Sequence, residues 1–303
     1  MIATAFAPAS IGNVGPGFDV LGLAVDGIGD TVSVTLTDGP ARVERVTGRD
    51  AELVPLDAAR NVSAIAALAW LRAHDDPRNP IVSIDKGLPL AGGMGGSAAS
   101  SVGGAYAAAL AAGAIPEARG VIAAALEGES AVAGRHLDNI APCVLGGLAL
   151  CRSVDPIDVV ALPVGASWWV ALVTPAVRVE TKAARALLPE MSERAEWIQQ
   201  MANTAALVHA FAAGNGELLS RALDDRYAEP RRAQLIPNFA AVKRAATKAG
   251  AFACTISGSG PTLFAIAEDE EAARRCAAAM QNAFGIGTTS HVGPIAKQGA
   301  RRA

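Results

Sequence analysis

The sequence predicts an α+β protein with two lobes, and three observations support that fold class. Strand-like and helix-like segments alternate irregularly, without the regular strand–helix order of a parallel α/β fold. The length of 303 residues suits one large or two moderate domains. Residues 155–163, "DPIDVVALP", have prolines near both ends and mark a change of composition, which predicts a junction. We expect a first lobe over residues 1–160 and a second lobe over residues 161–303.

The first lobe is expected to contain at least two strands and three helices. "TVSVTLT" (31–37) alternates apolar and polar residues and is rich in β-branched side chains, which is typical of a half-buried strand. "IVSID" (81–85) has the same character. The helical segments are expected at 61–75, 97–112 and 116–129. The last of them begins with a proline, which the first turn of a helix tolerates.

The second lobe is expected to begin with the strand "SWWVALV" (167–173). A long helix follows and carries large apolar residues on one face, namely Trp197, Met201, Val208 and Phe211. Residues 251–267 are expected to form two strands joined by a glycine turn. The remaining predicted elements are helices at 237–250 and 268–284 and a short strand near "TTSHVG".

Composition and charge exclude several classes of function. The net charge is −3, the pI is near 5.9, and the basic residues are scattered, so no nucleic-acid footprint is expected. No apolar run reaches the roughly 18 residues of a membrane span, and the first residues lack the basic start of a signal peptide. The four cysteines form no CxxC pair, and reduced cysteines suit a cytosolic protein. We therefore expect a cytoplasmic protein that binds neither nucleic acid nor membrane.

A glycine loop, "PLAGGMGGSAASS" (89–101), lies between the strand 81–85 and an alanine-rich helix. It contains no lysine, arginine or histidine. The first turn of a helix leaves backbone N–H groups unpaired and carries partial positive charge, and glycines let that backbone approach a ligand closely. This arrangement is typical of a phosphate site that needs no cationic side chain. Neither GxxxxGK(S/T) nor GxGxxG fits, because no lysine follows and the glycines are spaced differently.

Two questions stay open at this loop. It is either a phosphate site or a flexible turn that precedes a helix of small packing residues. The hydroxyl of Ser97, at the start of the helix, is either an N-cap or a ligand of a phosphate-bound magnesium ion.

The glycine loop resembles the ATP-binding motif of the GHMP small-molecule kinases. Two further stretches agree with that family in the same order, "APASIGNVGPGFDVLGLAV" (7–25) and "ISGSGPTLFAI" (256–266). Within the family, the branch that phosphorylates homoserine is the most similar, through "GNVGPGFDVLG", "HLDNIAPCVLGG", "TKAARALLP" and "EPRRAQLIPN". The similarity extends from Pro8 to about Ile266. It implies an N-terminal lobe like ribosomal protein S5 domain 2 and a ferredoxin-like C-terminal lobe.

The resemblance implies ATP-dependent phosphorylation of the side-chain hydroxyl of L-homoserine, which gives O-phospho-L-homoserine for threonine biosynthesis. ATP and Mg²⁺ are the implied cofactors, and a homodimer is the implied assembly. Asn61 is expected near the adenine. The residues expected to wrap the triphosphate are Pro89, Leu90, Ala91, Gly92, Gly93, Met94, Gly95, Gly96, Ser97, Ala98 and Ala99.

Two departures from the family pattern concern the phosphates and the metal. The family usually has two serines after the second loop glycine, where this chain has Gly96 and Ser97. The missing hydroxyl removes one phosphate hydrogen bond, worth about 1 kcal/mol, while Ser97 keeps the position that meets magnesium. "EGESAVAGRHLDN" is one residue shorter between its glycine and histidine than in relatives. Glu129 is therefore the better candidate for the second magnesium ligand, and Glu127 is the alternative.

A homoserine pocket needs an anionic group for the ammonium and guanidinium for the carboxylate. Asp19, with Asn13 beside it, suits the ammonium, although an Asx turn in a glycine-rich loop is the alternative. Arg185 and Arg232 suit the carboxylate, because a guanidinium fork binds it with two hydrogen bonds. Both arginines lie in helix-like stretches where a surface charge is the ordinary role, and Arg231 is the alternative to Arg232. Further pocket candidates are His136 and Thr181.

Phosphoryl transfer passes through a loose, charge-rich transition state, so positioning and electrostatic stabilisation dominate its catalysis. Where some GHMP kinases have an aspartate base, this chain has Asn139. Asp138 is adjacent, but neighbouring residues of an extended chain face opposite ways. We therefore expect no strong protein base, and the hydroxyl proton leaves late. The catalytic residues are expected to be Asn139, Ser97 and Glu129.

A second glycine turn, "GSGP" (258–261), is either only a tight hairpin or also a wall of the cleft, where the resemblance puts it. Three other functions stay open. A related kinase could phosphorylate mevalonate or shikimate, but a zwitterionic substrate explains Asp19 and the arginine pair together. A serine hydrolase using Ser97 or Ser259 lacks the GxSxG context. A non-catalytic sensor on the same fold is disfavoured by the presence of Ser97 and Glu129.

Overall fold

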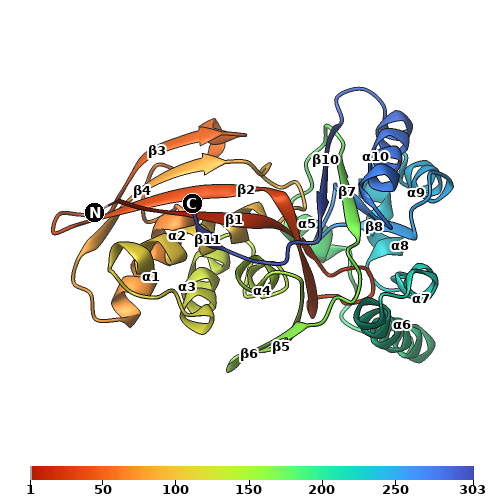
Figure 1. Ribbon diagram of the computed structural model, residues 1–303, viewed down its shortest axis with the longest axis horizontal. Helices are drawn as coiled ribbons and strands as arrows, with labels where there is room; N and C mark the ends of the chain where they lie inside the picture. The colour runs from red at the N-terminus through yellow and green to blue at the C-terminus, as the bar shows by residue number, and fades with distance from the viewer. Residues whose placement is uncertain (1) are drawn as a thin grey trace.

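The computed structural model describes residues 2–303, which fold into two lobes side by side (Figure 1). The larger lobe is built on a seven-stranded sheet and the smaller lobe on a four-stranded sheet. Both lobes combine strands with helices, so the predicted α+β class with two lobes is confirmed.

The seven-stranded sheet has the order β11-β1-β2-β4-β3, and β5 pairs with the first residues of β2 and with β6. Strands β3 and β4 are parallel, and the other neighbours are antiparallel. The strands are β1 (Ile2–Gly12), β2 (Leu21–Thr37), β3 (Arg42–Gly48), β4 (Asn79–Lys86), β5 (Leu148–Val154), β6 (Ile157–Leu162) and β11 (Arg301–Arg302). Both strands expected in this lobe, at 31–37 and 81–85, lie within β2 and β4.

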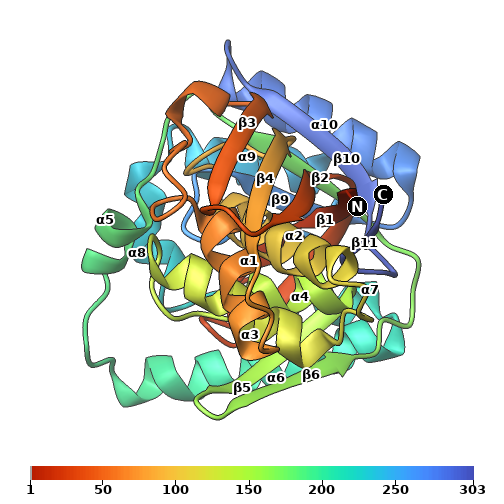
Figure 2. The ribbon, with the colours of Figure 1, turned by 90° about the vertical axis from the view of Figure 1, so that its left-hand side faces the viewer.

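Four helices cover one face of this sheet (Figure 2). They are α1 (Val62–Ala73), α2 (Gly96–Ala111), α3 (Ala118–Ser130) and α4 (Ile140–Leu145), and a short 3₁₀ helix spans Ala51–Leu53. The small residues of α2 allow close packing: a methyl group on Gly103 would lie 2.6 Å from the side chain of Val32, and one on Gly104 would lie 2.2 Å from the carbonyl oxygen of Ser63. Helix α2 is thus held tightly between the sheet and α1, which fixes the position of its first turn.

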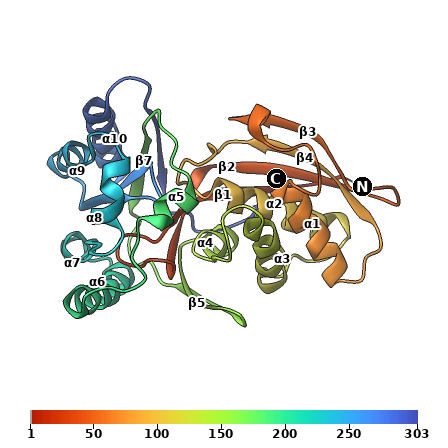
Figure 3. The ribbon, with the colours of Figure 1, turned by 180° about the vertical axis from the view of Figure 1, so that it is seen from behind.

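The four-stranded sheet is antiparallel, in the order β10-β7-β9-β8. Its strands are β7 (Trp169–Thr174), β8 (Ala253–Ile256), β9 (Leu263–Ala267) and β10 (Thr289–Pro294). The helices of this lobe are α5 (Thr181–Ala186), α6 (Arg194–Ala213), α7 (Gly216–Ala222), α8 (Glu229–Arg232), α9 (Phe239–Lys248) and α10 (Glu270–Phe284), with a 3₁₀ helix at Ala233–Leu235. Helix α5 lies between the lobes (Figure 3). Among the helices of residues 2–303, none combines the length and hydropathy that a membrane crossing needs.

The division between the lobes differs from the predicted one. Strand β6 continues to Leu162 and pairs with β5, so residues 155–162 form the turn and second strand of a hairpin of the first lobe instead of a junction. Strand β11 returns the end of the chain to the first sheet, where Arg301 pairs with Phe6. One proline of the segment lies in the hairpin turn and the other follows β6, which is why composition alone suggested a boundary.

The apolar face predicted on the long helix is wrong for the first half of α6. Phe211 is fully buried, but Trp197 and Met201 are 55% and 47% exposed. The inner side of this half is polar, since the side-chain amide of Gln200 donates a hydrogen bond to the carbonyl of Pro16 at 3.0 Å. Hydrogen bonds, instead of apolar packing, attach this part of α6 to the first lobe.

Candidate active site

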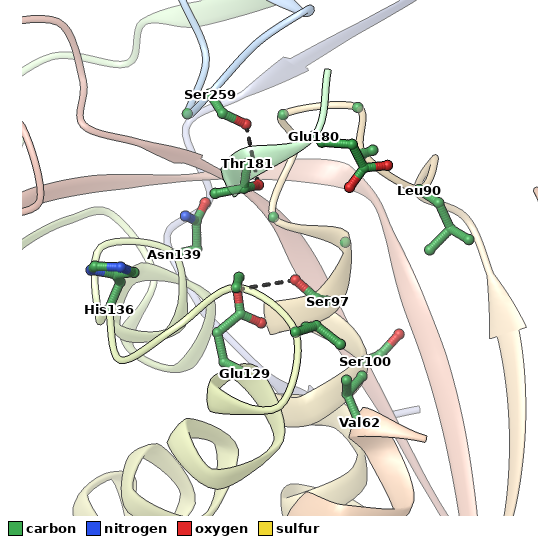
Figure 4. A pocket seen from close by; sticks show the side chains of 18 of the residues that line it. Val62, Leu90, Ser97, Ser100, Glu129, His136, Asn139, Glu180, Thr181 and Ser259 are labelled. Carbon is green, nitrogen blue, oxygen red and sulfur yellow. Dashed lines mark hydrogen bonds between the residues drawn. The ribbon is translucent and has the colours of Figure 1, made fainter. Parts of the chain in front are cut away.

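A pocket of about 430 Å³ lies where the two lobes meet (Figure 4). Residues of both glycine turns, of the segment after α3 and of the α5 segment form its walls. The predicted site residues that line it are Asn13, Asp19, Pro89, Leu90, Ala91, Gly92, Gly93, Gly95, Gly96, Ser97, Glu129, His136, Asn139, Thr181, Arg185 and Arg232. The predicted residues buried outside its lining are Asn61, Met94, Ala98 and Ala99.

Asn61 has a structural role next to the pocket. Its Oδ1 accepts hydrogen bonds from the N–H groups of Ser63 and Ala64 at 3.1 and 3.2 Å, and thereby caps α1. Its amide nitrogen donates to the carbonyl of Pro55 at 2.9 Å. These bonds use both ends of the side chain, so Asn61 shapes a wall whose lining residues are its neighbours. Those residues are Val54, Pro55, Arg60 and Val62.

The glycine loop is packed on both sides. Gly93 and Gly95 have φ values of +77° and +66°, in the left-handed region that favours glycine. A methyl group on Gly93 would lie 2.5 Å from the carbonyl oxygen of Ser257, and one on Gly95 would lie 2.0 Å from Oγ of Ser10. A flexible turn would tolerate such additions, so this loop is a rigid connection between β4 and α2.

The start of α2 faces the pocket with its backbone N–H groups unclaimed by side chains. The helix has 16 residues and begins at Gly96, and within the described chain no side chain caps its first turn. The carbonyl groups of Gly92 and Gly93 accept hydrogen bonds from Thr262 and Ser257, on the other lobe. With carbonyl oxygens turned to the protein and a helix start at the pocket wall, the loop suits an anion.

Ser97 and Glu129 come together beside the start of α2. The hydroxyl of Ser97 donates a hydrogen bond to Oε1 of Glu129 at 3.0 Å. Oε2 of Glu129 is buried without a hydrogen-bond partner among residues 2–303, and burial raises the pKa of this carboxyl to about 7. Glu127, in contrast, forms an exposed ion pair with Arg135 at 3.2 Å. A cation would satisfy the orphaned oxygen, so the geometry favours Glu129 over Glu127 as a magnesium ligand.

Lys86, the last residue of β4, was missed in the sequence. Its buried ammonium group borders the pocket, donates to the carbonyl of Gly96 at 3.1 Å and pairs with the carboxylate of Asp30. The other oxygen of Asp30 accepts the N–H groups of Gly87 and Leu88 at 3.1 and 3.2 Å. This pair ties the beginning of the loop to the start of α2. The signal that could have found it is the lysine directly before the loop, in "IDKGLPLAGG".

The other end of the pocket carries charged side chains. The carboxylate of Asp19 accepts two hydrogen bonds from the guanidinium of Arg185, at 2.8 and 3.0 Å. Nδ1 of His136 lies 3.8 Å from Oδ1 of Asp19. Burial lowers the pKa of His136, which favours the neutral ring at physiological pH. The structure therefore brings these three predicted residues into one cluster.

Arg232 is a buried cation whose hydrogen bonds within the described chain go only to carbonyl oxygens. It is 3% exposed and donates to the carbonyls of Gly258 and Ala184 at 3.1 and 3.4 Å, and among residues 2–303 it forms no ion pair. Burial lowers the pKa of Arg232, and the charge of a second arginine adds to this effect. Arg231 instead pairs with Glu196 at 3.0 Å, outside the pocket lining. The geometry thus favours Arg232, and a buried cation without a direct ion-pair partner in residues 2–303 suits an anionic ligand group.

Phe18 contacts the guanidinium groups of both Arg185 and Arg232, and it was not identified as a site residue from the sequence. The Cζ atoms of Arg185 and Arg232 lie 5.3 and 5.4 Å from the centre of its ring, within the range of cation–π contacts. The ring itself meets the edge of Tyr227 at 5.2 Å between centroids. Phe18 lies inside "GNVGPGFDVLG", but an aromatic residue in a glycine-rich segment has no local pattern that assigns it to arginines far along the chain.

The second glycine turn joins β8 to β9 and also forms a wall of the pocket, through Gly258 and Ser259. The hydroxyl groups of Thr181 and Ser259 lie 3.4 Å apart (Figure 4). The side chain of Asn13 donates to the carbonyl of Gly258 at 2.9 Å and accepts the N–H of Asp19 at 3.0 Å. This second bond spans six residues, so it is not an Asx turn, and Asn13 instead connects the charged cluster to the turn.

Asp138 and Asn139 depart from the predicted geometry. Asn139 precedes α4 with φ −99° and ψ −39°, a helical conformation in which neighbouring side chains do not alternate. A methyl group on Gly12 would lie 2.5 Å from Oδ2 of Asp138 and 2.6 Å from Nδ2 of Asn139, so both side chains approach one point. Both line the pocket, and the prediction that Asp138 faces away is wrong. Burial, followed by the charge of Asp19, raises the pKa of Asp138 to about 7, and its Oδ2 accepts the N–H of Asn13 at 3.1 Å.

Two family models match the chain. The "GHMP kinases N terminal domain" model matches residues 61–147, which include the glycine loop and Glu129, and the "GHMP kinases C terminal" model matches residues 207–286, which include Arg232. The chain belongs to the GHMP kinase family. The resemblance noted in the sequence is therefore confirmed, and this GHMP kinase is a phosphotransferase.

The GHMP kinase is similar to several proteins named homoserine kinase. It is 38% identical to the homoserine kinase of Chlorobium phaeobacteroides (strain BS1), with 98% of each chain covered. It is 40% identical to that of Xylella fastidiosa (strain 9a5c), over 99% of this chain and 93% of the other. The crystal structure of homoserine kinase from Cytophaga hutchinsonii ATCC 33406 matches it with a TM-score of 0.94 and 39% identity, covering 100% of this chain and 97% of that one.

Two expectations about this GHMP kinase stay predictions, namely the homodimer and the cytoplasmic location.

Proposed function

We propose that this GHMP kinase transfers the γ-phosphoryl group of ATP to the side-chain hydroxyl of L-homoserine and releases O-phospho-L-homoserine, which serves threonine biosynthesis. One observation carries the proposal: a single pocket has a helix start with uncapped N–H groups at one end and Asp19, Arg185 and Arg232 at the other. A polyphosphate and a small zwitterion are the two ligands that such ends suit. The names of relatives at 38% and 40% identity support the same substrate.

The residues present fit a magnesium ion next to the phosphates. Ser97 and Glu129 offer a hydroxyl and a carboxylate, which are hard oxygen donors of the kind that Mg²⁺ prefers, and Oε2 of Glu129 is the buried atom without a partner in the described chain. When bound, the ion would neutralise charge on the phosphate oxygens. One carboxylate and one hydroxyl leave most positions for phosphate oxygens and water, as is usual for magnesium in kinases.

A zwitterion can exchange with the pair of Asp19 and Arg185 without leaving a charge alone. The ammonium of the zwitterion takes the place of the Arg185 guanidinium at Asp19. The carboxylate of the zwitterion then accepts hydrogen bonds from Arg185 and from Arg232, which donates only to carbonyl oxygens in the described chain. Mevalonate and shikimate have a carboxylate but no ammonium. They would separate Asp19 from Arg185 and supply no new cation, which is unfavourable in a half-buried site.

The chain's own residues contribute to the transfer mainly by position. The charged cluster orients the substrate so that its hydroxyl points toward the helix start, and the amide of Asn139 lies on the wall between the two ends. The transition state is loose, so the hydroxyl proton leaves late and no strong base is needed. Asp138 reaches the same wall, but its Oδ2 already accepts the N–H of Asn13. Asp138 is therefore not the base in this proposal.

The test is a comparison of four acceptors with the purified protein and MgATP. ADP release is measured with L-homoserine, L-threonine, mevalonate and shikimate one at a time, and phosphorus NMR identifies the product. We expect a rate with L-homoserine at least about 30-fold above those with mevalonate and shikimate, because each good charge pair lost is worth about 2 kcal/mol or more. L-threonine keeps both charged groups, so its rate tests the position of the hydroxyl instead. A measurable rate only with mevalonate or shikimate would overturn the assignment of homoserine.

A further inference from the structure

The side-chain amide of Asn139 is held by one buried hydroxyl. Ser10, on β1, is 1% exposed, and its hydroxyl donates a hydrogen bond to Oδ1 of Asn139 at 3.0 Å, although the residues are 129 positions apart in the sequence. The backbone N–H of Ser10 donates to the carbonyl of Met94 at 3.2 Å. Ser10 therefore joins the glycine loop to the wall that carries Asn139.

The bond from Ser10 selects one of two orientations of the amide. It holds Oδ1 at the hydroxyl and leaves Nδ2 without a hydrogen-bond partner within the described chain, on a residue that lines the pocket. In the flipped amide, Nδ2 would donate to Oγ of Ser10, and the buried hydroxyl proton would lose its acceptor. The flipped amide would also present Oδ1 to a pocket that is suited to anionic oxygens.

This orientation matters because the oxygens of a phosphoryl group are acceptors only. An N–H group aimed at them stabilises the charge that develops during transfer, whereas a carbonyl oxygen repels it. A methyl group on Gly95, the residue before α2, would lie 2.0 Å from Oγ of Ser10 and 3.0 Å from Oδ1 of Asn139, and one on Gly12 would lie 2.6 Å from Nδ2. The pair of side chains therefore lies directly against the helix start that we assign to the phosphates.

We propose that Ser10 is a positioning residue for phosphoryl transfer, whose buried hydroxyl keeps the N–H groups of Asn139 directed into the pocket. This inference rests on the proposed kinase function and on the pocket assigned to it. It also explains why an amide is used at 139: a carboxylate bonded to Ser10 in the same way would place its second oxygen, an acceptor, toward the phosphates.

The test is a double-mutant cycle between Ser10→Ala and Asn139→Ala. We expect Ser10→Ala to lower kcat about tenfold, because the amide then samples both orientations, and to leave KM for ATP and for L-homoserine within about twofold. We expect Asn139→Ala to lower kcat about a hundredfold. In the Asn139→Ala background, Ser10→Ala is expected to change kcat less than about twofold, because a residue that acts only through Asn139 has nothing left to position.

Two variants control for effects on folding. Ser33→Ala removes a hydroxyl from β2 that bonds Thr4 at 2.9 Å, outside the pocket lining, and is expected to leave kcat unchanged. Ser10→Cys keeps a weak donor of similar size and is expected to lose less activity than Ser10→Ala. It also allows the measurement if the alanine variant does not fold, since its loss of kcat must likewise vanish in the Asn139→Ala background. Thermal unfolding midpoints are recorded for all variants.

The outcomes separate this inference from the substrate assignment. An unchanged kcat in Ser10→Ala, a loss only in KM, or a full tenfold loss that persists in the Asn139→Ala background would overturn the positioning role while wild-type activity on L-homoserine stands. If the wild type instead phosphorylates mevalonate or shikimate, the substrate assignment fails alone, and the same cycle is measured with that alcohol. A wild type that phosphorylates none of the four alcohols would overturn both.

Discussion

At its glycine-loop end the pocket is lined by main-chain groups, whereas at its other end it is lined by charged side chains. The first end comes from one continuous stretch, residues 89–97, which leads directly into α2. The second end combines Asp19, Arg185 and Arg232, which belong to separate parts of both lobes. The phosphate site that we propose is therefore built locally, whereas the proposed selectivity for a small zwitterion requires the whole fold.

The two ends of the pocket also differ in whether their buried cation has an ion-pair partner. Lys86, beside the glycine loop, is paired with the buried carboxylate of Asp30, so its charge is compensated inside the protein. Arg232 bonds only to carbonyl oxygens within residues 2–303, so its charge is available to a ligand. We infer that the loop end attracts phosphate mainly through the helix start, and that the other end chooses the substrate through its charges.

The largest expected effect concerns Glu129, the proposed metal ligand at the loop end. Glu129→Gln removes the buried carboxylate and should lower kcat/KM about a thousandfold and weaken the apparent affinity for Mg²⁺. The matched control is Glu127→Gln, which removes an exposed carboxylate paired with Arg135 and should stay within about twofold. Initial rates over a range of Mg²⁺ concentrations measure both. Equal losses in the two variants would contradict the choice of Glu129.

At the opposite end, Arg232→Lys should lower kcat/KM for L-homoserine about a hundredfold, chiefly through KM. A lysine keeps the charge but not the planar fork that binds a carboxylate with two hydrogen bonds. Arg231→Lys, next to it, changes an arginine that pairs with Glu196 outside the pocket lining and should change the rate less than about threefold. Saturation curves for L-homoserine at high ATP measure kcat and KM for both variants. A larger loss of kcat/KM in Arg231→Lys would assign the substrate carboxylate to Arg231 instead of Arg232.

Between the two ends, Asp138 should make stability depend on pH. Its pKa is near 3.8 when unfolded and about 7 in the folded protein, mainly because of burial, so the folded state binds its proton more tightly. The resulting stabilisation is complete below pH 3.8 and is lost as the pH rises through 7. From pH 5 to pH 8 the wild type should therefore lose about 3 kcal/mol relative to Asp138→Asn. Denaturant unfolding of both proteins at each pH measures this, and parallel pH profiles would contradict the buried, raised pKa.

The smallest expected effect is that of Asp138→Asn on turnover, which should fall less than about tenfold. A loose transition state needs little assistance from a base, and the amide keeps an oxygen that accepts the N–H of Asn13. Steady-state kcat at saturating substrates, with nucleotide binding and unfolding measured alongside, provides the check. A loss above about a thousandfold in a folded, ATP-binding variant would identify Asp138 as the base.

Local patterns predicted the elements that a short stretch specifies by itself. The strand, glycine loop and alanine-rich helix are contiguous, and α2 begins at Gly96, one residue from the predicted start. The apolar face of α6 shows the limit of such patterns. The spacing of apolar residues along the helix does not reveal that Gln200, on the inner side of α6, donates a hydrogen bond to the carbonyl of Pro16. Trp197 therefore lies on the outer, exposed side of the helix.

The sequence by itself determined the two-lobed α+β class, the glycine loop at a helix start and the family. Only the tertiary structure decided that Asp138 lines the pocket, that Phe18 contacts two arginines, and that Ser10 bonds Asn139. The physical reason is the range of the interactions. Helix starts and turns depend on neighbours in the chain, whereas burial, pKa shifts and the choice of hydrogen-bond partner depend on segments that meet only when both lobes have packed.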